Sequence, residues 1–260
     1  MATTYNRGRC LRILLTNDDG IHAEGLLALQ CRFAEIASVT IVAPDRERSA
    51  VSHMLTLRNP LRYKRIGENA YAVDGTPADS VFIALAEIMK DNQPAIVISG
   101  INRGANVGDD VNYSGTVAGA REAAMHGIQS FAISSAARRH HNFVQAADFA
   151  ACLVEFLREN PLPPRTLLNV NIPEASSPDR VGEYRFSRLG QRVYRDELVK
   201  NTNPRGEDYY WIGGEQTGTQ KYPNSDIETV ANGYISVTPL GVDQTEHALL
   251  TKLQASGIRR

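Results

Sequence analysis

Short apolar runs alternate along the chain with longer stretches whose apolar residues recur at helical spacing. The runs have the length of strands that are buried on both faces, and turn residues bound each of them. Because a strand, a helix and a further strand in succession imply parallel pairing, the pattern predicts an α/β fold with a mostly parallel sheet. Strands are predicted at residues 11–15, 39–43, 95–99, 129–134 and 167–172, and helices at 23–36, 78–89, 117–126 and 143–159.

Two adjacent carboxylates, Asp18 and Asp19, follow the first predicted strand and precede Gly20. In open α/β sheets, ligands bind beyond the carboxyl ends of the strands. Two ionised carboxylates repel each other, and a bound cation removes that repulsion. Oxygen ligands of this kind suit magnesium, manganese or calcium. The alternative is that Asp18 or Asp19 caps the following helix while Gly20 provides the turn.

Further polar loops are expected at the same edge of the sheet. The loop after the second strand carries Ser49, and a loop rich in Gly, Asn and Asp carries Asn102 and Asn106. A hydroxyl and amide oxygens next to two carboxylates form a plausible site for a hard cation. Turn chemistry concentrated in one loop indicates a shaped binding loop rather than a simple connector.

A phosphate site is predicted where Ser114-Gly115-Thr116 precedes a helix of small residues. Backbone N–H groups at a helix N-terminus bind anions, although ordinary capping by Ser114 or Thr116 is the alternative. A cation site beside a phosphate site predicts metal-assisted phosphoryl transfer to water. His22 and His53 are close in sequence to this set, and each is either a proton shuttle or an ordinary loop residue.

The composition is that of an ordinary globular protein, with 42% hydrophobic residues and a net charge of −1 in 260 residues. This charge gives no indication of a nucleic-acid duplex or a membrane as a partner. Three scattered cysteines and an N-terminal arm, Met1 to Arg9, without an apolar signal-peptide core predict a cytoplasmic protein. Because neither a P-loop nor a Gly-x-Gly-x-x-Gly fingerprint is present, a nucleoside triphosphatase or a dinucleotide dehydrogenase is disfavoured.

The pattern changes after residue 173. Residues 174–232 are polar, turn-rich and dotted with aromatic side chains, which indicates an irregular or hairpin-like extension. A strand at 234–238 and a helix within 243–254 are expected to follow. We predict a single domain over 1–260, with an α/β core at 1–173 and an extension at 174–260.

Six segments resemble the SurE family of stationary-phase survival proteins, which are metal-dependent 5′/3′-nucleotidases. They occur in collinear order over nearly the whole chain: ILLTNDDG (13–20), APDRERSAVSH (43–53), DGTPADSV (74–81), SGINRGANVGDDVNYSGTVAGAREAAMHG (99–127), LNVNIP (168–173) and GYISVTPL (233–240). The resemblance implies a Rossmann-like three-layer α/β/α core and a β-rich C-terminal extension that forms a homodimer or homotetramer. It also implies hydrolysis of nucleoside 5′- and 3′-monophosphates and, in some members, of short polyphosphate.

The resemblance further implies one magnesium or manganese ion per subunit. Its ligands would be Asp18, Asp19, Ser49 and Asn102. Our own mechanistic hypothesis gives Asp19 and Asn102 a further role in catalysis. Asn106 and the turn formed by Ser114, Gly115 and Thr116 would border the phosphate. Whether Asp19 also serves as a base or forms an aspartyl-phosphate stays open at this point.

Two other functions remain as alternatives. One is a haloacid-dehalogenase-like phosphatase, although that family separates its paired aspartates by one residue whereas Asp18 and Asp19 are contiguous. The other is a non-catalytic regulator that binds a nucleotide or a metal through a degenerate site.

Overall fold

The computed structural model describes residues 11–137, 139–174, 182–194, 197–213, 216–220 and 222–257. The N-terminal arm and residues 175–181 of the predicted extension lie outside this set. Within the described residues no helix is long and apolar enough to cross a membrane.

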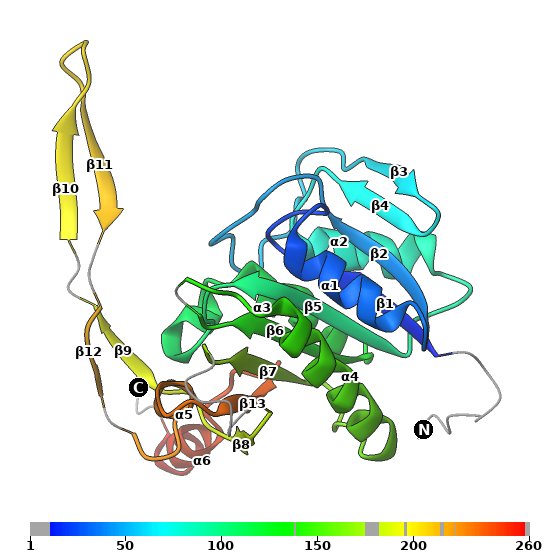
Figure 1. The fold of residues 1–260 in the computed structure, drawn as a ribbon. Coiled ribbons are helices and arrows are strands. Elements are labelled where there is room, and N and C mark those ends of the chain that lie inside the picture. Colours follow the sequence, from blue (N-terminus) through cyan, green and yellow to red (C-terminus); the bar gives the residue numbers. More distant parts are fainter. Residues whose placement is uncertain are drawn as a thin grey trace.

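The core of the molecule is a nine-stranded sheet with the order β3-β4-β2-β1-β5-β6-β7-β13-β8 (Figure 1). Its central strands β2, β1, β5, β6 and β7 all pair in parallel, as the alternation of strands and helices predicts. The antiparallel pairs are β3 with β4 and β13 with β7. The strands of this sheet are β1 (Arg12–Thr16), β2 (Ser38–Pro44), β3 (Tyr63–Gly67), β4 (Ala70–Val73), β5 (Ile96–Arg103), β6 (Gln129–Ser135), β7 (Thr166–Ile172), β8 (Tyr184–Phe186) and β13 (Ile235–Gly241).

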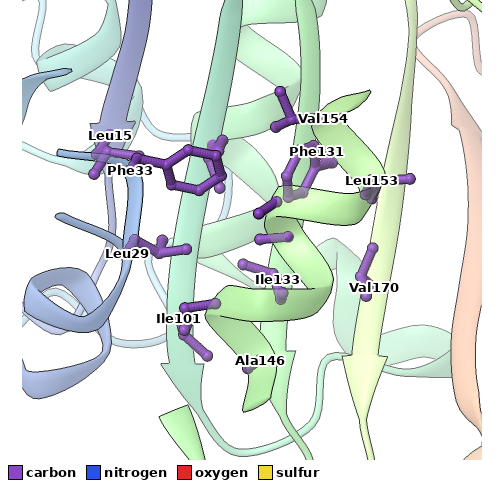
Figure 2. Close-up of a cluster of buried hydrophobic side chains, with 14 of the residues drawn as sticks. Leu15, Leu29, Phe33, Ile101, Phe131, Ile133, Ala146, Leu153, Val154 and Val170 are labelled. Atoms are coloured by element: carbon purple, nitrogen blue, oxygen red, sulfur yellow. The ribbon is translucent and has the colours of Figure 1, made fainter. Parts of the chain in front are cut away.

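Helices cover both faces of the sheet, which confirms the three-layer α/β/α architecture. The helices α1 (Glu24–Phe33) and α4 (Phe143–Glu159) share a buried apolar cluster on one face, where Phe33 and Phe131 are among the largest buried side chains (Figure 2). On the other face, α2 (Pro77–Ile83) and α3 (Gly115–Met125) pack side by side. A π-helical turn, η1 (Ala84–Ile88), continues α2, and a 3-10 turn, η2 (Gly108–Asn112), precedes α3.

The start of α2 matches its sequence signal. Thr76 accepts a hydrogen bond from the Asp79 backbone N–H, and the Asp79 carboxylate accepts one from the Thr76 backbone N–H, which forms a capping box with Pro77 at the first helical position. The Asp79 carboxylate also accepts the backbone N–H and the hydroxyl of Thr56. This carboxylate therefore joins the loop after β2 to the start of α2.

β5 is longer than predicted, because the strand continues through Gly100 to Arg103 and contains a bulge between Gly100 and Asn102. A Cβ atom on Gly100 would lie 2.2 Å from the Ile133 carbonyl oxygen, so only glycine allows β5 to approach β6 this closely. The first part of the predicted binding loop is therefore rigid strand, and Asn102 sits on it.

The C-terminal extension contributes to two regions. Its strands β8 and β13 complete the central sheet, while β9 (Gln191–Tyr194) and β12 (Gln216–Gln220) lead to a hairpin, β10 (Glu197–Thr202) and β11 (Asp208–Gly213), which projects from the body (Figure 1). Two helices, α5 (Asp226–Ala231) and α6 (His247–Ser256), flank β13 in the chain. The last two strands of the sheet, β13 and β8, come from the predicted extension. The division of the chain into a core and an extension stays a prediction.

Candidate active site

A cleft of about 390 Å³ lies where β1, β2 and β5 end. The structure brings together here six of the predicted site residues: Asp18, Asp19, Ser49, Asn102, Asn106 and Ser114. Glu47, Asp110 and Tyr113 complete much of the remaining wall. The cleft therefore occupies the edge at which ligands bind in open α/β sheets.

Asp18 is buried, with 5% of its surface exposed, and is held by the first turn of α3. Its carboxylate accepts hydrogen bonds from the Thr116 backbone N–H at 3.1 Å and from the Thr116 hydroxyl at 2.5 Å. A Cβ atom on Gly115 would lie 3.0 Å from the Asp18 Cβ, so glycine permits this close approach. Burial raises the pKa of Asp18 to about 6 and the neighbouring Asp19 adds to the rise, while the hydrogen bonds from Thr116 oppose it.

Asp19 is more open and faces the cleft from the same loop. Its Oδ2 accepts the Arg103 backbone N–H at 3.2 Å. Burial raises its pKa, the charge of Glu47 adds to the rise, and the bond from Arg103 opposes it. Neither aspartate caps α1, whose N-cap is Ala23 and has no side-chain cap. The capping alternative for Asp18 and Asp19 is therefore wrong.

Ser49 and Asn102 supply neutral oxygen atoms to the cleft. The Ser49 hydroxyl donates to Glu47 Oε1 at 2.6 Å, and Asn102 Nδ2 donates to the Gly104 carbonyl oxygen at 2.9 Å. Because Nδ2 is the donor in that bond, the amide oxygen of Asn102 is the atom that a cation would use. Among the residues described, no group of three or more His, Cys, Asp or Glu side chains has metal-binding geometry. A cation here would thus depend on the hydroxyl and the amide in addition to the two aspartates.

The start of α3 serves Asp18 directly. Ser114 is the N-cap, and its side chain accepts the Val117 backbone N–H at 3.0 Å, so the capping alternative for Ser114 is correct. Thr116 is fully buried and bonds to Asp18, and neither it nor Gly115 lines the cleft. The structure therefore places Gly115 and Thr116 behind the Asp18 carboxylate, while Ser114 lines the wall of the cleft.

Asn106 is fixed by amide side chains that sequence reasoning did not single out. Its backbone N–H donates to Asn171 Oδ1 at 2.8 Å, and its carbonyl oxygen accepts from Asn169 at 2.7 Å and from Asn171 at 3.0 Å. Its own Nδ2 donates to the Ser134 hydroxyl at 2.8 Å. Both asparagines are fully buried on β7, where they alternate with apolar residues inside the family segment LNVNIP.

A second missed residue, Asp226 at the start of α5, anchors the loop from the side of the extension. One of its oxygens accepts the Gly108 backbone N–H at 2.8 Å, and the other accepts the N–H groups of Gly190 at 2.7 Å and Ile227 at 2.8 Å. Nearby, Arg192 forms an ion pair of 2.7 Å with Asp110 in the cleft wall. The extension thus supports the active-site loop and does more than project from the core.

The two histidines singled out from sequence have different surroundings. His22 lines a hollow beside Asp19. His53 Nε2 lies 2.7 Å from Glu122 Oε2, and His126 Nε2 lies 3.1 Å from Glu122 Oε1. His53 therefore ties the loop that carries Ser49 to a buried carboxylate on α3. Burial by itself would raise the pKa of Glu122, but the bonds to His53 and His126 outweigh it, and the pKa is lowered.

We expect Glu122→Gln to destabilise the protein by about 1–2 kcal/mol at neutral pH, because a charge-assisted bond to His53 is lost. A carboxyl group whose pKa is lower in the folded than in the unfolded protein stabilises the fold at pH values above its unfolded pKa, about 4.3. This stabilisation disappears as the pH falls through the pKa of the folded state. The difference in free energy of unfolding between the two proteins should therefore shrink below about pH 4, as measured by urea titration. Glu155→Gln, at an exposed site, is the control. A difference that is constant with pH would contradict the assignment.

The family model for Survival protein SurE matches residues 13–196. The chain belongs to the SurE family. The 5′-nucleotidase SurE of Myxococcus xanthus is 46% identical over 253 residues, which cover 96% of this chain and 95% of that protein.

Other members of the SurE family agree in sequence and fold. The 5′-nucleotidase SurE of Vibrio cholerae serotype O1 strain N16961 is 46% identical over 243 residues, which cover 94% of this chain and 96% of that protein. The crystal structure of the SurE protein from Aquifex aeolicus superposes with a TM-score of 0.83 at 37% identity and covers 94% of this chain and 99% of that chain. The family and the fold class predicted from the sequence motifs are thereby confirmed.

Proposed function

We propose that this chain is a metal-dependent 5′-nucleotidase, a phosphoric monoester hydrolase that converts nucleoside 5′- and 3′-monophosphates to nucleoside and phosphate. The observation that carries the proposal is the convergence of Asp18, Asp19, Ser49 and Asn102 on one cleft of a SurE-family fold. The names of the curated relatives support the substrate class. Short polyphosphate is a second proposed substrate, since its terminal group offers the same phosphoryl oxygens.

The donor set fits one magnesium or manganese ion per subunit. Asp18 and Asp19 are adjacent carboxylates whose pKa values are raised chiefly by burial, with the charge of Asp19 adding to the rise at Asp18 and that of Glu47 to the rise at Asp19. A cation would relieve this repulsion. Ser49 and Asn102 would add oxygen ligands of the hardness these ions prefer. When bound, such an ion neutralises charge on phosphoryl oxygens and lowers the pKa of a coordinated water.

The protein side chains position the reacting groups. The N-terminus of α3 holds Asp18 in one orientation through Thr116, so Thr116 acts as a positioning residue. Ser114 and Asn106 line the cleft and border the phosphate, while Gly115 lies behind Asp18. Asn106 Nδ2 carries two N–H groups, of which one donates to the Ser134 hydroxyl, and in our proposal the other donates to the phosphate.

Asp19 is the carboxylate with access to the reacting phosphate, and Asn102 stabilises the equatorial oxygens beside it. In our proposal water attacks phosphorus as the P–O bond to the nucleoside breaks. Asp19 accepts a proton from the water, and this proton passes to the leaving nucleoside oxygen. Acid-quench trapping during turnover tests the covalent route, and a phosphorylated peptide containing Asp19 would replace the water route with an aspartyl-phosphate.

Phosphate release tests the function directly. Nucleoside 5′- and 3′-monophosphates are incubated with the protein in the presence of magnesium, manganese or a chelator. We expect release that requires a divalent ion and is abolished by chelation. Absence of release with every nucleotide and metal would favour the alternative of a non-catalytic regulator.

We further propose that the protein is a homodimer or homotetramer whose contacts involve the extension. The hairpin of β10 and β11 exposes a row of large apolar side chains, and surfaces of this kind mark protein–protein contacts. They are Leu198, Val199, Tyr209, Tyr210, Trp211 and Ile212. A cytoplasmic location is also proposed, on the basis of the sparse cysteines.

Replacing residues 197–213 by a short Gly-Ser linker is expected to reduce the assembly state while the core stays folded. Truncation at residue 173 is a poorer test, because it would remove β13 and β8 from the central sheet. Light scattering coupled to size-exclusion chromatography measures the mass, and circular dichroism reports the fold. An unchanged mass would exclude the hairpin as the contact.

A further inference from the structure

A second hollow, of about 280 Å³, adjoins the active-site cleft. The two share Asp19, Glu47 and Arg103, and the second hollow adds His22, Glu24 and Phe143. Its volume is near the lower limit for small-molecule sites, about 300 Å³. A ligand whose phosphate lies beside Asp19 would therefore have space for the rest of the molecule in this hollow.

Planar side chains gather at this hollow. Phe143, the first residue of α4, is half-buried, and the Arg103 guanidinium carbon lies 5.9 Å from the centre of its ring. The His141 imidazole stacks on the same phenyl ring at 5.5 Å with an angle of 8° between the planes. Aromatic rings and guanidinium planes are the groups on which proteins stack nucleic-acid bases.

A carboxylate stands next to these planar groups. Glu24 Oε2 accepts a hydrogen bond from Arg103 Nη2 at 2.6 Å, and the Glu24 side chain is 71% exposed. Arg103 is in turn fixed to Asp19 through its backbone N–H. An exposed carboxylate accepts hydrogen bonds from sugar hydroxyls, and Glu24 lines the same hollow as Asp19 and Phe143.

We propose that this hollow is the nucleoside subsite. The base of the nucleotide stacks on Phe143 and Arg103, and the ribose hydroxyls donate to Glu24 while the phosphate lies beside Asp19. The proposal rests on the proposed nucleotidase function and adds the part of the protein that recognises the nucleoside. Phe143 and Glu24 are outside the six segments that carry the family resemblance.

Phe143→Ala tests the subsite through two substrates that differ only by the base, AMP and ribose 5-phosphate. We expect the KM for AMP to rise about tenfold, within the range reported for loss of one base–aromatic contact, while the KM for ribose 5-phosphate and both kcat values stay unchanged. Phe143→Tyr, which keeps the ring, should restore the KM for AMP. Phe156→Ala removes an exposed phenylalanine from the far end of α4 and is the matched control.

Product inhibition gives a second measurement. Phe143→Ala should weaken inhibition by adenosine about tenfold and leave inhibition by inorganic phosphate unchanged. An equal change with both substrates would mean that Phe143 acts through the fold and would overturn the subsite. No change with AMP and adenosine would place the base elsewhere. A wild-type protein that hydrolyses neither substrate would instead overturn the proposed function, and the subsite with it.

Discussion

Asp19→Asn is expected to lower kcat for nucleoside monophosphates by about 10³-fold in the presence of magnesium or manganese. The substitution keeps the shape of the side chain and its bond to the Arg103 N–H, but it removes the charge that would offset a divalent cation. Stabilisation of phosphoryl charge by a bound metal amounts to several kcal/mol, and each 1.4 kcal/mol changes the rate about tenfold. Initial rates of phosphate release over a metal titration measure the effect.

The control for Asp19→Asn is Asp109→Asn, which changes the same chemical group on the exposed side of η2, outside the cleft wall. It should retain the activity of the unmodified protein. Excess manganese should recover part of the Asp19→Asn activity if the defect lies in affinity for the ion. Equal rates for Asp19→Asn and the unmodified protein would remove Asp19 from the metal site.

Asp226→Ala is expected to destabilise the fold by about 3 kcal/mol and to lower activity as well. Three backbone N–H groups lose their acceptor, and each buried donor without a partner costs about 1–3 kcal/mol. Part of that cost is offset, because burial raises the pKa of Asp226 and the carboxylate is itself unfavourably desolvated. Activity falls because Gly108, released from Asp226, follows Asn106 in the active-site loop.

Thermal unfolding measures the change, and a loss of 3 kcal/mol corresponds to a fall in Tm of about 6–12 °C for a chain of this size. Asp226→Asn keeps one oxygen as acceptor, so its Tm should lie between those of Asp226→Ala and the unmodified protein. Asp91→Ala, at an exposed turn, should change Tm by little. A Tm for Asp226→Ala equal to that of Asp91→Ala would show that the three bonds contribute nothing measurable.

Local patterns in the sequence predicted most of the core. The apolar runs gave β1, β2, β5, β6 and β7 to within a few residues, and the predicted helix at 143–159 coincides with α4. These elements are buried on one or both faces, so their periodicity follows directly from packing. The polar residues that follow these strands also predicted the location of the site. The carboxyl ends of parallel strands meet at one edge of the sheet, regardless of how far apart the strands lie in the chain.

The supporting residues could not be predicted from local patterns. Asn169 and Asn171 look like polar interruptions of a strand, and their role depends on the backbone of Asn106, more than sixty positions earlier. Asp226 has an ordinary position at a helix start, yet it bonds to Gly108, 118 residues away. Interactions of this length appear only once the chain is folded.

The position of β13 has a consequence for the order in which the protein forms during synthesis. β13 pairs with β7, but about sixty residues separate the end of β7 from the start of β13. At ribosomal rates of roughly 5–20 residues per second, the edge of β7 stays without its antiparallel neighbour for several seconds. Unpaired strand edges attract other chains. The nascent chain is therefore most exposed to misassembly just before its last strand emerges.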